Sequence, residues 1–582
     1  MNTFSHNYFL GYINEVTPQY VKVHFPSSNL LDKFLHQGIH YAGGNVGNFI
    51  VIEGEEYGFL ARIIELNLPN SERIEISEKA IHHDETDFHP SGKAELLLSF
   101  SVFEPQKTEK TVSKYPSIGA KVYACSDEQI EIYVKEFGKK EDKTDNVYAE
   151  IGKLTSNDAK CHVSLNALFG RHCAVVGTTG GGKSWTVAKL IESIIHQTDN
   201  KIILIDATGE YSNLTSNSID IGNGVNIFHY SQLTIDELYY LLKPSSKTQV
   251  PKLMEAIRSL KIVKILQGKP LEKTIDALNK VVTKIENDLV IKKDSDKRPY
   301  EAFYYKNIQK IEDKYCDFCF EKLPYQITQE CIWDSASEGS GLNRKEIPTK
   351  WGGRNDTDVS YCVSLISRVN NLLCTDEYNK IFGFKTERND TDLTNVIDNF
   401  ITTGSGILRI NFANVSFDFQ VREILVNAIG KYLLSKARND TFVHAPIIVV
   451  MDEAHQFLNK SIKDEYFEAK QLDAFDLIAK ECRKYGLFLC LATQMPRDIP
   501  IGTLSQMGSF IVHRLINELD KKAIENAASS ANRSALSFLP ILGEGEALLI
   551  GVDFPMPLLI KVNAPNNKPE SNTPRLTKKG AQ

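Results

Sequence analysis

The stretch CAVVGTTGGGKSWTVAKL, from Cys173 to Leu190, decides the fold of this chain. An apolar run, CAVV, leads into a glycine-rich loop, and the loop leads into the helix-like segment KSWTVAKLIESIIHQ. Residues 177–184 fit the pattern G-x-x-x-x-G-K-[ST] in the strand, loop and helix context that this phosphate-binding loop requires. The stretch therefore predicts an α/β core that holds a nucleoside triphosphate.

The composition of the loop has a physical reason. Glycines let backbone N–H groups curl around phosphate oxygens, and the N-terminus of the following helix adds about half a positive charge. We expect Lys183 to reach the β and γ phosphates and Ser184 to bind Mg²⁺. The residues predicted to contact the nucleotide are Gly177, Thr178, Thr179, Gly180, Gly181, Gly182, Lys183, Ser184 and Trp185.

Two adjacent carboxylates follow a second apolar run in IIVVMDEAH, from Ile447 to His455. We predict that Asp452 organises Mg²⁺ and that Glu453 orients or activates the attacking water. An acid placed to activate water favours hydrolysis over transfer to a second substrate. No N-K-x-D tetrapeptide for reading guanine is present, which favours ATP as the nucleotide.

A third apolar run, LFLCLATQ, ends in Gln494, where a neutral amide at a strand tip would face the γ phosphate. We interpret Gln494 as a residue that senses the phosphate state. The alternative interpretation is a glutamine that only caps the end of a core strand.

The rest of the chain divides by pattern. Before residue 150, short segments bounded by Gly, Pro, Asn and Ser predict a small β-barrel, with QYVKVHF and IEIYVKEF among its strands. Apolar strands alternate with helical segments from about residue 165, which indicates a parallel sheet. A charged, helix-rich insertion separates the two parts of this core, and GEALLIGV and PLLIKVNAP predict terminal strands.

Composition limits the function classes. The formal net charge of -7 argues against a chain that coats nucleic acid by bulk attraction, although a local basic channel is compatible with it. No apolar run of about 18 residues and no secretory leader is found, which predicts a cytoplasmic protein with no membrane partner. Ten dispersed cysteines favour free thiols. Cys316, Cys319 and Cys331 fall one ligand short of a zinc site.

Five segments in one order carry a family resemblance: RHCAVVGTTGGGKS, ILIDATGEY, VVMDEAH, IAKECRKYGLFLCLATQMP and HRLINELD. Together they resemble the HerA branch of the HerA/FtsK superfamily of hexameric DNA-translocating ATPases. The resemblance implies a RecA-like P-loop ATPase core with an N-terminal small β-barrel, a helical insertion and a C-terminal strand extension. The predicted units are residues 1–150 (barrel), 151–244 (first part of the core), 245–400 (insertion), 401–535 (second part of the core), and 536–582 (strand extension and flexible tail).

The resemblance also implies roles for four further residues. Asp206 and Glu210, in IDATGEY, match a family segment that supports the nucleotide site, although a strand-end aspartate with a helix cap would look the same. Arg483, in ECRKYG, matches an arginine that reaches a neighbouring subunit's nucleotide, and Arg171 matches a basic residue shortly before the loop. Either arginine would look similar on a solvated face. The chain departs from the family pattern at Met495, which puts coupling to DNA in doubt.

The function that the resemblance implies is a homohexameric, ATP-driven translocase or helicase on double-stranded DNA, acting in DNA end processing or antiphage defence. Such motors act with a nuclease or with an NAD-consuming effector encoded nearby. The alternative is an ATP-regulated oligomeric scaffold that activates a toxic effector without translocation. A secretion or conjugation ATPase is disfavoured by the barrel and by the lack of a membrane segment.

Overall fold

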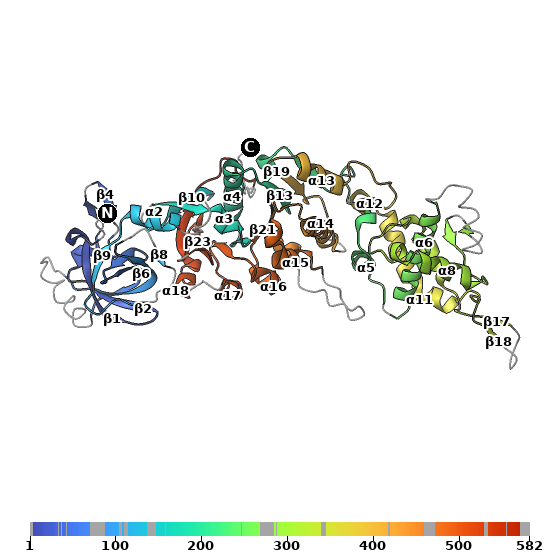
Figure 1. The fold of residues 1–582 in the computed structure, drawn as a ribbon, viewed down its shortest axis with the longest axis horizontal. Coiled ribbons are helices and arrows are strands. Elements are labelled where there is room, and N and C mark those ends of the chain that lie inside the picture. The colour runs from blue at the N-terminus through green and yellow to red at the C-terminus, as the bar shows by residue number, and fades with distance from the viewer. Residues whose placement is uncertain are drawn as a thin grey trace, which may run out of the picture.

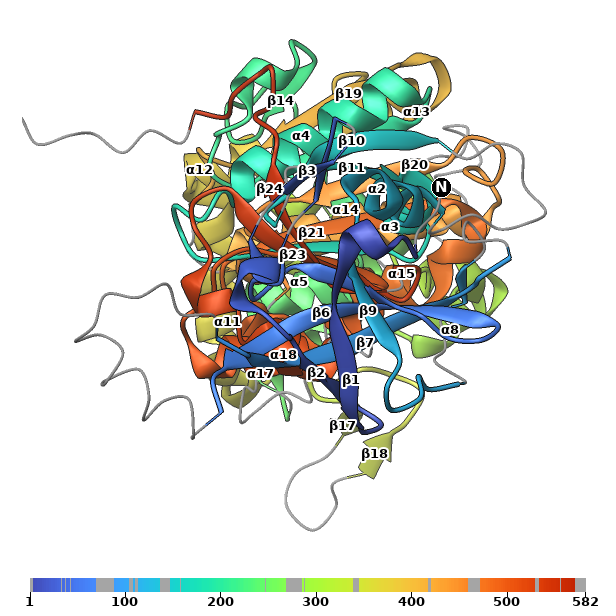
Figure 2. The same cartoon turned by 90° about the vertical axis from the view of Figure 1, so that its left-hand side faces the viewer.

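The computed structural model describes residues 4–32, 34–36, 38–41, 43–69, 88–103, 108–109, 114–136, 147–156, 159–245, 247–267, 285–286, 288–338, 345–416, 420–458, 472–528, 533–554 and 556–570. These residues form three units in a row, with a barrel at one end, an α/β core in the middle and a helical unit at the other end (Figure 1). Figure 2 looks along this row from the barrel side. The core therefore has a neighbour from its own chain at each end.

The N-terminal unit is a closed, antiparallel β-barrel, as predicted. The sheet closes because β2 pairs with β7 as well as with β1, with Val21 opposite Ala94. Alternate residues point inward, so Val21, Val23 and Phe25 are fully buried. The barrel strands are β1 (Phe9–Val16), β2 (Tyr20–His24), β5 (Phe49–Ile52), β6 (Tyr57–Asn67), β7 (Ser91–Ser101) and β9 (Lys121–Ala124), with β3 (Phe34–His36), β4 (Ile39–Tyr41) and β8 (Thr108–Glu109) beside them.

One predicted barrel strand is wrong. The segment IEIYVKEF lies largely in helix α2 (Asp127–Glu136). Its buried residues Ile130, Tyr133 and Val134 follow helical spacing, and Ser126 accepts a hydrogen bond from the backbone N–H of Gln129 at the start of the helix. A short apolar run fits a strand or a helix, and here the helical spacing decides.

The core is an 11-stranded sheet in which seven consecutive strands, from β22 to the edge strand β14, are parallel. The strand before the glycine loop, β12, is separated from β20 by β21, and β13 lies beyond β20. The strands in sheet order are β11 (Lys160–Ser164), β10 (Tyr148–Leu154), β24 (Leu558–Val562), β23 (Glu546–Gly551), β22 (Ser509–Val512), β12 (Cys173–Val176), β21 (Leu487–Thr493), β20 (Ile447–Met451), β13 (Lys201–Asp206), β19 (Ile407–Asn411) and β14 (Ser218–Asp220).

Both faces of this sheet are buried, which explains the continuous apolar runs. In β12, Cys173 and Val175 pack on the face covered by α4 (Lys183–Gln197), whereas Ala174 and Val176 pack on the opposite face. That opposite face is covered by α14 (Val421–Arg438) and α15 (Ala474–Glu481). Around this core lie α3 (Leu165–Phe169), α16 (Ile501–Leu504), α17 (Glu518–Ala527) and α18 (Arg533–Leu536).

The helical unit at the far end contacts the core through α14, which packs against α5. It includes two small hairpins, β15–β16 (Ile285–Glu286, Leu289–Val290) and β17–β18 (Ala336–Glu338, Lys345–Ile347). Helix α13 lies back near the core (Figure 1). The helices are α5 (Ile235–Leu242), α6 (Gln249–Gln267), α8 (Lys297–Lys306), α9 (Ile308–Ile311), α10 (Leu323–Glu330), α11 (Asp356–Cys374), α12 (Asp376–Phe382) and α13 (Leu393–Thr403).

The two predicted terminal strands are confirmed as β23 and β24, which extend the core sheet in antiparallel fashion. The tail predicted to be flexible begins at Lys568; Lys568 and Glu570 contact the core instead, and the part beyond Glu570 lies outside the described residues. Of the three cysteines considered for a metal, Cys316 and Cys331 are buried and Cys319 is exposed. Within the described ranges, no helix combines the length and the apolar character needed to cross a membrane.

Candidate nucleotide site and the opposite edge of the sheet

The glycine loop joins β12 to α4 at the carboxyl edge of the parallel sheet. Gly180 and Gly182 have φ angles of 76° and 103°, which favour glycine, and α4 begins at the next residue, Lys183. A Cβ atom on Gly177 would lie 2.5 Å from the Cβ atom of His513. The loop therefore has the curled backbone and the open helix N-terminus that phosphate binding requires.

Lys183 and Glu453 form a buried ion pair at this edge. The Lys183 ammonium donates to Glu453 Oε1 at 2.7 Å, and both residues are nine-tenths or more buried. Glu453 has a φ of 44°, a left-handed conformation that turns the chain sharply at the end of β20. His455 Nδ1 lies 3.2 Å from Glu453 Oε2 and 3.2 Å from Thr493 Oγ1. Glu453 is thus held between Lys183, which follows β12, and His455, which lies in the same loop as Glu453 after β20.

Asp452 is the most perturbed acid of the site. It is 1% exposed, and burial together with the charges of Glu453, Glu210 and Asp206 raises its pKa to about 7, against the opposing effect of Lys183. Its Oδ1 atom has no hydrogen-bond partner among the described residues. Such a buried carboxylate oxygen, within the influence of the Lys183 charge, is suited to a hard cation such as Mg²⁺.

The carboxylate of Asp206, a residue predicted to support the nucleotide site, is bonded to other residues of the chain. Its carboxylate accepts from Arg409 Nε at 2.8 Å and from the backbone N–H groups of Gly209 and Tyr211 at 2.8 Å and 3.2 Å. Arg409 also donates to the Gly209 carbonyl at 3.1 Å. Asp206 therefore organises residues 206–211 and so places Glu210, whose buried Oε2 has no hydrogen-bond partner in the described part of the chain.

Gln494 contacts the glycine loop directly. Thr179 Oγ1 donates to Gln494 Oε1 at 2.6 Å, and Gln494 follows β21, the strand between β12 and β20. On the other side of β12, the backbone carbonyl of Arg514 accepts from the N–H and the hydroxyl of Thr178 at 3.1 Å and 3.2 Å. The loop is tied to both neighbouring strands.

Arg483 and Arg171 lie at the opposite edge of the sheet. Arg171 precedes β12 and Arg483 precedes β21, so each stands at the amino end of its strand, whereas Gln494 stands at the carboxyl end. The seven residues of β21 span about 23 Å. The structure does not bring the two arginines to the glycine loop of their own chain.

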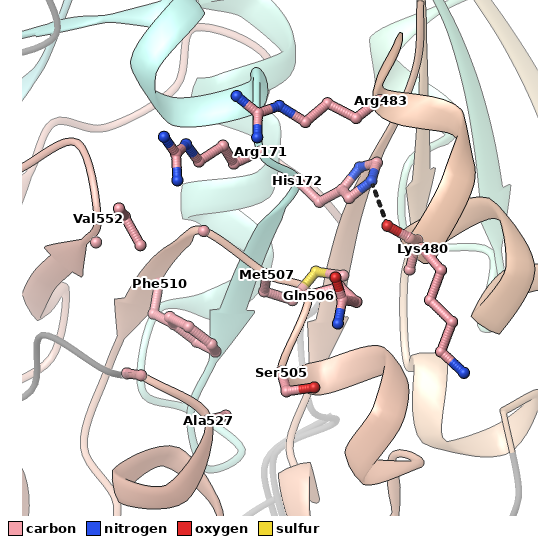
Figure 3. A pocket seen from close by; sticks show the side chains of 14 residues that line it. Arg171, His172, Lys480, Arg483, Ser505, Gln506, Met507, Phe510, Ala527 and Val552 are labelled. Carbon is pink, nitrogen blue, oxygen red and sulfur yellow. Dashed lines mark hydrogen bonds between the residues drawn. The ribbon is translucent and has the colours of Figure 1, made fainter. Parts of the chain in front are cut away.

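The two arginines share a cavity of about 270 Å³ (Figure 3). Arg171 pairs with Asp553 through a 3.2 Å contact, whereas Arg483 is exposed and has no ion pair within the described ranges. Beneath them, His172 is buried with a φ of 61°: its Nδ1 accepts from the Leu489 N–H at 3.0 Å and its Nε2 lies 3.1 Å from the Ala479 carbonyl. Burial lowers the pKa of His172 to about 4, so the His172 side chain is neutral where it supports the edge that carries the two arginines.

Comparison with known proteins finds a matching family model and several similar helicases. The family model described as Helicase HerA, central domain, matches residues 149–334. A probable helicase of Methanocaldococcus jannaschii is 22% identical over 94% of this chain and 85% of its own length. The DNA double-strand break repair helicase HerA of Sulfolobus acidocaldarius is 25% identical over 73% of this chain and 71% of its own length. These matches support the HerA-type ATPase superfamily for this chain.

Among solved structures, VirB4 of Thermoanaerobacter pseudethanolicus is similar to this chain, with 14% identity, a TM-score of 0.42, and coverage of 72% of this chain and 97% of that one. The family model and the HerA relatives bear out the resemblance seen in the five motifs at the level of the superfamily, and they support an ATPase.

Sequence reasoning missed several residues of this HerA-type site. His513 is fully buried, and its Nε2 lies 2.8 Å from the Thr186 hydroxyl on α4. Arg409 and His455 were also missed, although both stand at or near the carboxyl ends of core strands. That position was the available signal, because the carboxyl ends of parallel strands meet at the ligand-binding edge of such a sheet.

Proposed function

We propose that this protein is an ATP-driven motor on double-stranded DNA, built as a homohexamer with each ATP site completed by the neighbouring copy. One observation carries the proposal: Lys183 and Glu453 lie at the carboxyl edge of the core sheet, whereas Arg483, which has no ion pair among the described residues, is exposed at the amino edge. A head-to-tail contact would bring these two edges together. An arginine supplied from a neighbour contributes about 10³ to 10⁵ in rate in P-loop hydrolases.

The residues of the site have distinct tasks in this proposal. Lys183 exchanges Glu453 for the β and γ phosphates of ATP, which frees the Glu453 carboxylate to orient the attacking water. Ser184 and Asp452 would hold Mg²⁺, which neutralises phosphate charge when bound. Gln494, bonded to Thr179 of the loop, links the phosphate site to β21 and thereby to the arginine edge.

The DNA substrate is inferred from the two relatives compared above, one named as a probable helicase and the other as a DNA double-strand break repair helicase. We further propose a cytoplasmic location and a nuclease or NAD-consuming effector as partner, in DNA end processing or antiphage defence. The barrel and the helical unit, at the two ends of the row in Figure 1, are the surfaces in which to look for that partner. Purification from the native host followed by mass spectrometry tests this part.

The motor proposal is tested by ATP hydrolysis with and without duplex DNA. Hydrolysis should rise with duplex DNA and should disappear in Lys183→Ala. A purified oligomer that hydrolyses ATP at the same rate without DNA, and that does not bind duplex at low salt, would contradict the proposal. Low salt is specified because phosphate contacts weaken steeply as salt rises.

The shared site is tested by mixing two inactive variants. Lys183→Ala and Arg483→Ala are each expected to lose hydrolysis when pure. In mixed oligomers, an Arg483→Ala copy has an intact glycine loop and can receive Arg483 from a Lys183→Ala neighbour, so part of the activity should return. The control is a mixture of Lys183→Ala with the double variant, which offers no complete site. No recovery in mixed oligomers would contradict a site shared between copies.

A further inference from the structure

The segment Asn563–Glu570, which follows β24, runs across the nucleotide-binding edge of its own chain. Its first residue is fixed to β10, because the Asn563 N–H donates to the Ile151 carbonyl at 3.0 Å and its amide donates to Glu150 Oε1 at 3.1 Å. Two prolines of the segment, Pro565 and Pro569, are buried although their neighbours are exposed. The segment is thus packed against the core along its length.

Glu192, two turns into α4, anchors the middle of the segment. Its carboxylate accepts from the backbone N–H groups of Asn566 and Asn567, at 3.0 Å and 2.7 Å, and Glu192 is only 6% exposed. Hydrogen bonds from backbone N–H groups to a buried carboxylate are charge-assisted and stronger than neutral ones. A glutamate on the helix that begins at the glycine loop therefore fixes the C-terminal segment.

Beyond this anchor, the segment reaches the first turn of α4, which directly follows the glycine loop. The Lys568 ammonium lies over the ring of Trp185, 5.3 Å from its centroid, and Trp185 is in the first turn of α4. An ammonium over an indole face is attracted by the ring quadrupole. Trp185 remains 38% exposed, directly after the residue expected to bind Mg²⁺.

The end of the segment contacts the loop that carries the third carboxylate of the site. The Glu570 N–H donates to the Glu210 carbonyl at 2.7 Å, and the Asn213 amide lies 3.5 Å from the Lys568 carbonyl. The Glu210 charge is one of those that raise the pKa of Asp452. One short segment therefore touches both α4 and the Glu210 loop.

We propose that Asn563–Glu570 is a strap that positions Trp185 and the Glu210 loop, with Glu192 as its positioning residue, and that strap closure sets the affinity of the site for ATP. This inference rests on the proposed function, since it concerns regulation of the same site. The apparent affinity of a ligand falls by the fraction of molecules in the competent state. An open strap therefore raises the apparent dissociation constant without removing any group that contacts the phosphates.

The test is nucleotide binding and hydrolysis by Glu192→Ala in the full chain. Losing a charge-assisted anchor should raise the dissociation constant and the KM for ATP by about threefold to tenfold, with kcat within about twofold of wild type. Glu192→Gln, which keeps one acceptor, should show a smaller rise. The matched control is Glu570→Ala, because among the described residues Glu570 contacts the core through its backbone N–H; this variant should bind ATP as wild type does. Unchanged ATP affinity in a folded Glu192→Ala overturns the strap.

Tryptophan fluorescence supplies a second readout. The chain has three tryptophans, so the spectrum of wild type minus that of Trp185→Phe isolates Trp185. ATP should change this signal in wild type, and Glu192→Ala should already have an altered signal without ATP. A Trp185 signal that is identical in wild type and Glu192→Ala contradicts the proposed positioning. An unchanged signal is what a merely local loss of stability at Glu192 would give.

Amide hydrogen exchange on the unmodified protein separates the failure of the strap from the failure of the proposed function. ATP should slow exchange at Asn566, Asn567 and Glu570 together with the amides of the glycine loop. Protection of the glycine loop without protection of the strap refutes the strap alone. Lack of protection at both, with no binding of ATP, refutes the proposed nucleotide site instead.

Discussion

Replacing Asp452 by asparagine should stabilise the protein in the absence of nucleotide while it abolishes hydrolysis. Asp452 is buried among carboxylates, and its Oδ1 has no hydrogen-bond partner in the described part of the chain. Its charged form is therefore unfavourable until a cation arrives. The amide of asparagine has nearly the same shape and carries no charge.

The magnitude follows from the pKa of this group. The pKa of Asp452 is about 7 in the folded protein and 3.8 for an unperturbed aspartate. The folded state thus binds more protons than the unfolded state between these values, so stability decreases as pH rises through this window, and the loss is complete above pH 7. A rise of about three pKa units corresponds to about 4 kcal/mol as an upper limit.

The assay is urea or thermal unfolding of wild type and Asp452→Asn at pH 5 and pH 8, without nucleotide or divalent cation. The variant should gain up to about 4 kcal/mol at pH 8 and less than half of that gain at pH 5, and its stability should depend less on pH. Asp334→Asn is the control, because the Asp334 side chain is 94% exposed. An Asp452→Asn variant that is equal to or less stable than wild type at pH 8 would refute the reasoning.

Three further outcomes are expected. Glu453→Gln should bind ATP but hydrolyse it at least about 10²-fold more slowly, because the amide cannot accept a proton; single-turnover hydrolysis near the wild-type rate would contradict the assigned role. Arg409→Met should lower the free energy of unfolding by about 3–5 kcal/mol, because it leaves the Asp206 carboxylate buried without its guanidinium partner. Adding Asp206→Asn should recover much of this loss. Urea unfolding that shows Arg409→Met to be as stable as wild type argues against this reasoning. Gly177→Ala should weaken ATP binding at least about tenfold, because the new Cβ would lie 2.5 Å from a histidine Cβ, whereas Gly353→Ala, with open space around it, should not; equal affinity in both would exclude the clash.

Much of the core could be predicted because its strands are buried on both faces. A parallel strand between two helical layers needs apolar residues at every position. CAVV and IIVVM meet this need, because they are apolar throughout and do not alternate with polar residues. The short segment at Ile130 failed for the opposite reason. It is apolar over too few residues for its spacing to distinguish a strand from a helix, and packing against its neighbours decided the outcome.

The site was predictable where its chemistry is local in sequence. Lys183 stands in a loop whose neighbours explain its role, and Glu453 is the second residue after its strand. The ion pair between Arg409 and Asp206 joins two residues far apart in the chain, and their contact exists only because β13 and β19 are adjacent. The contact of Lys568 with Trp185 likewise joins distant residues. Such partners are set by strand order, which the sequence pattern leaves open.

The separation of Arg483 from Lys183 across the sheet has a consequence for assembly. A subunit with one half of its proposed active site on each of two opposite edges is polar, so a two-fold symmetric pair cannot complete both sites, and only heterologous, head-to-tail contacts can. In an open row of such subunits, one terminal copy always keeps a glycine loop without an arginine and the other keeps an arginine without a loop. Closing the row into a ring completes the last site, so the number of working sites per subunit itself reports whether the ring is closed.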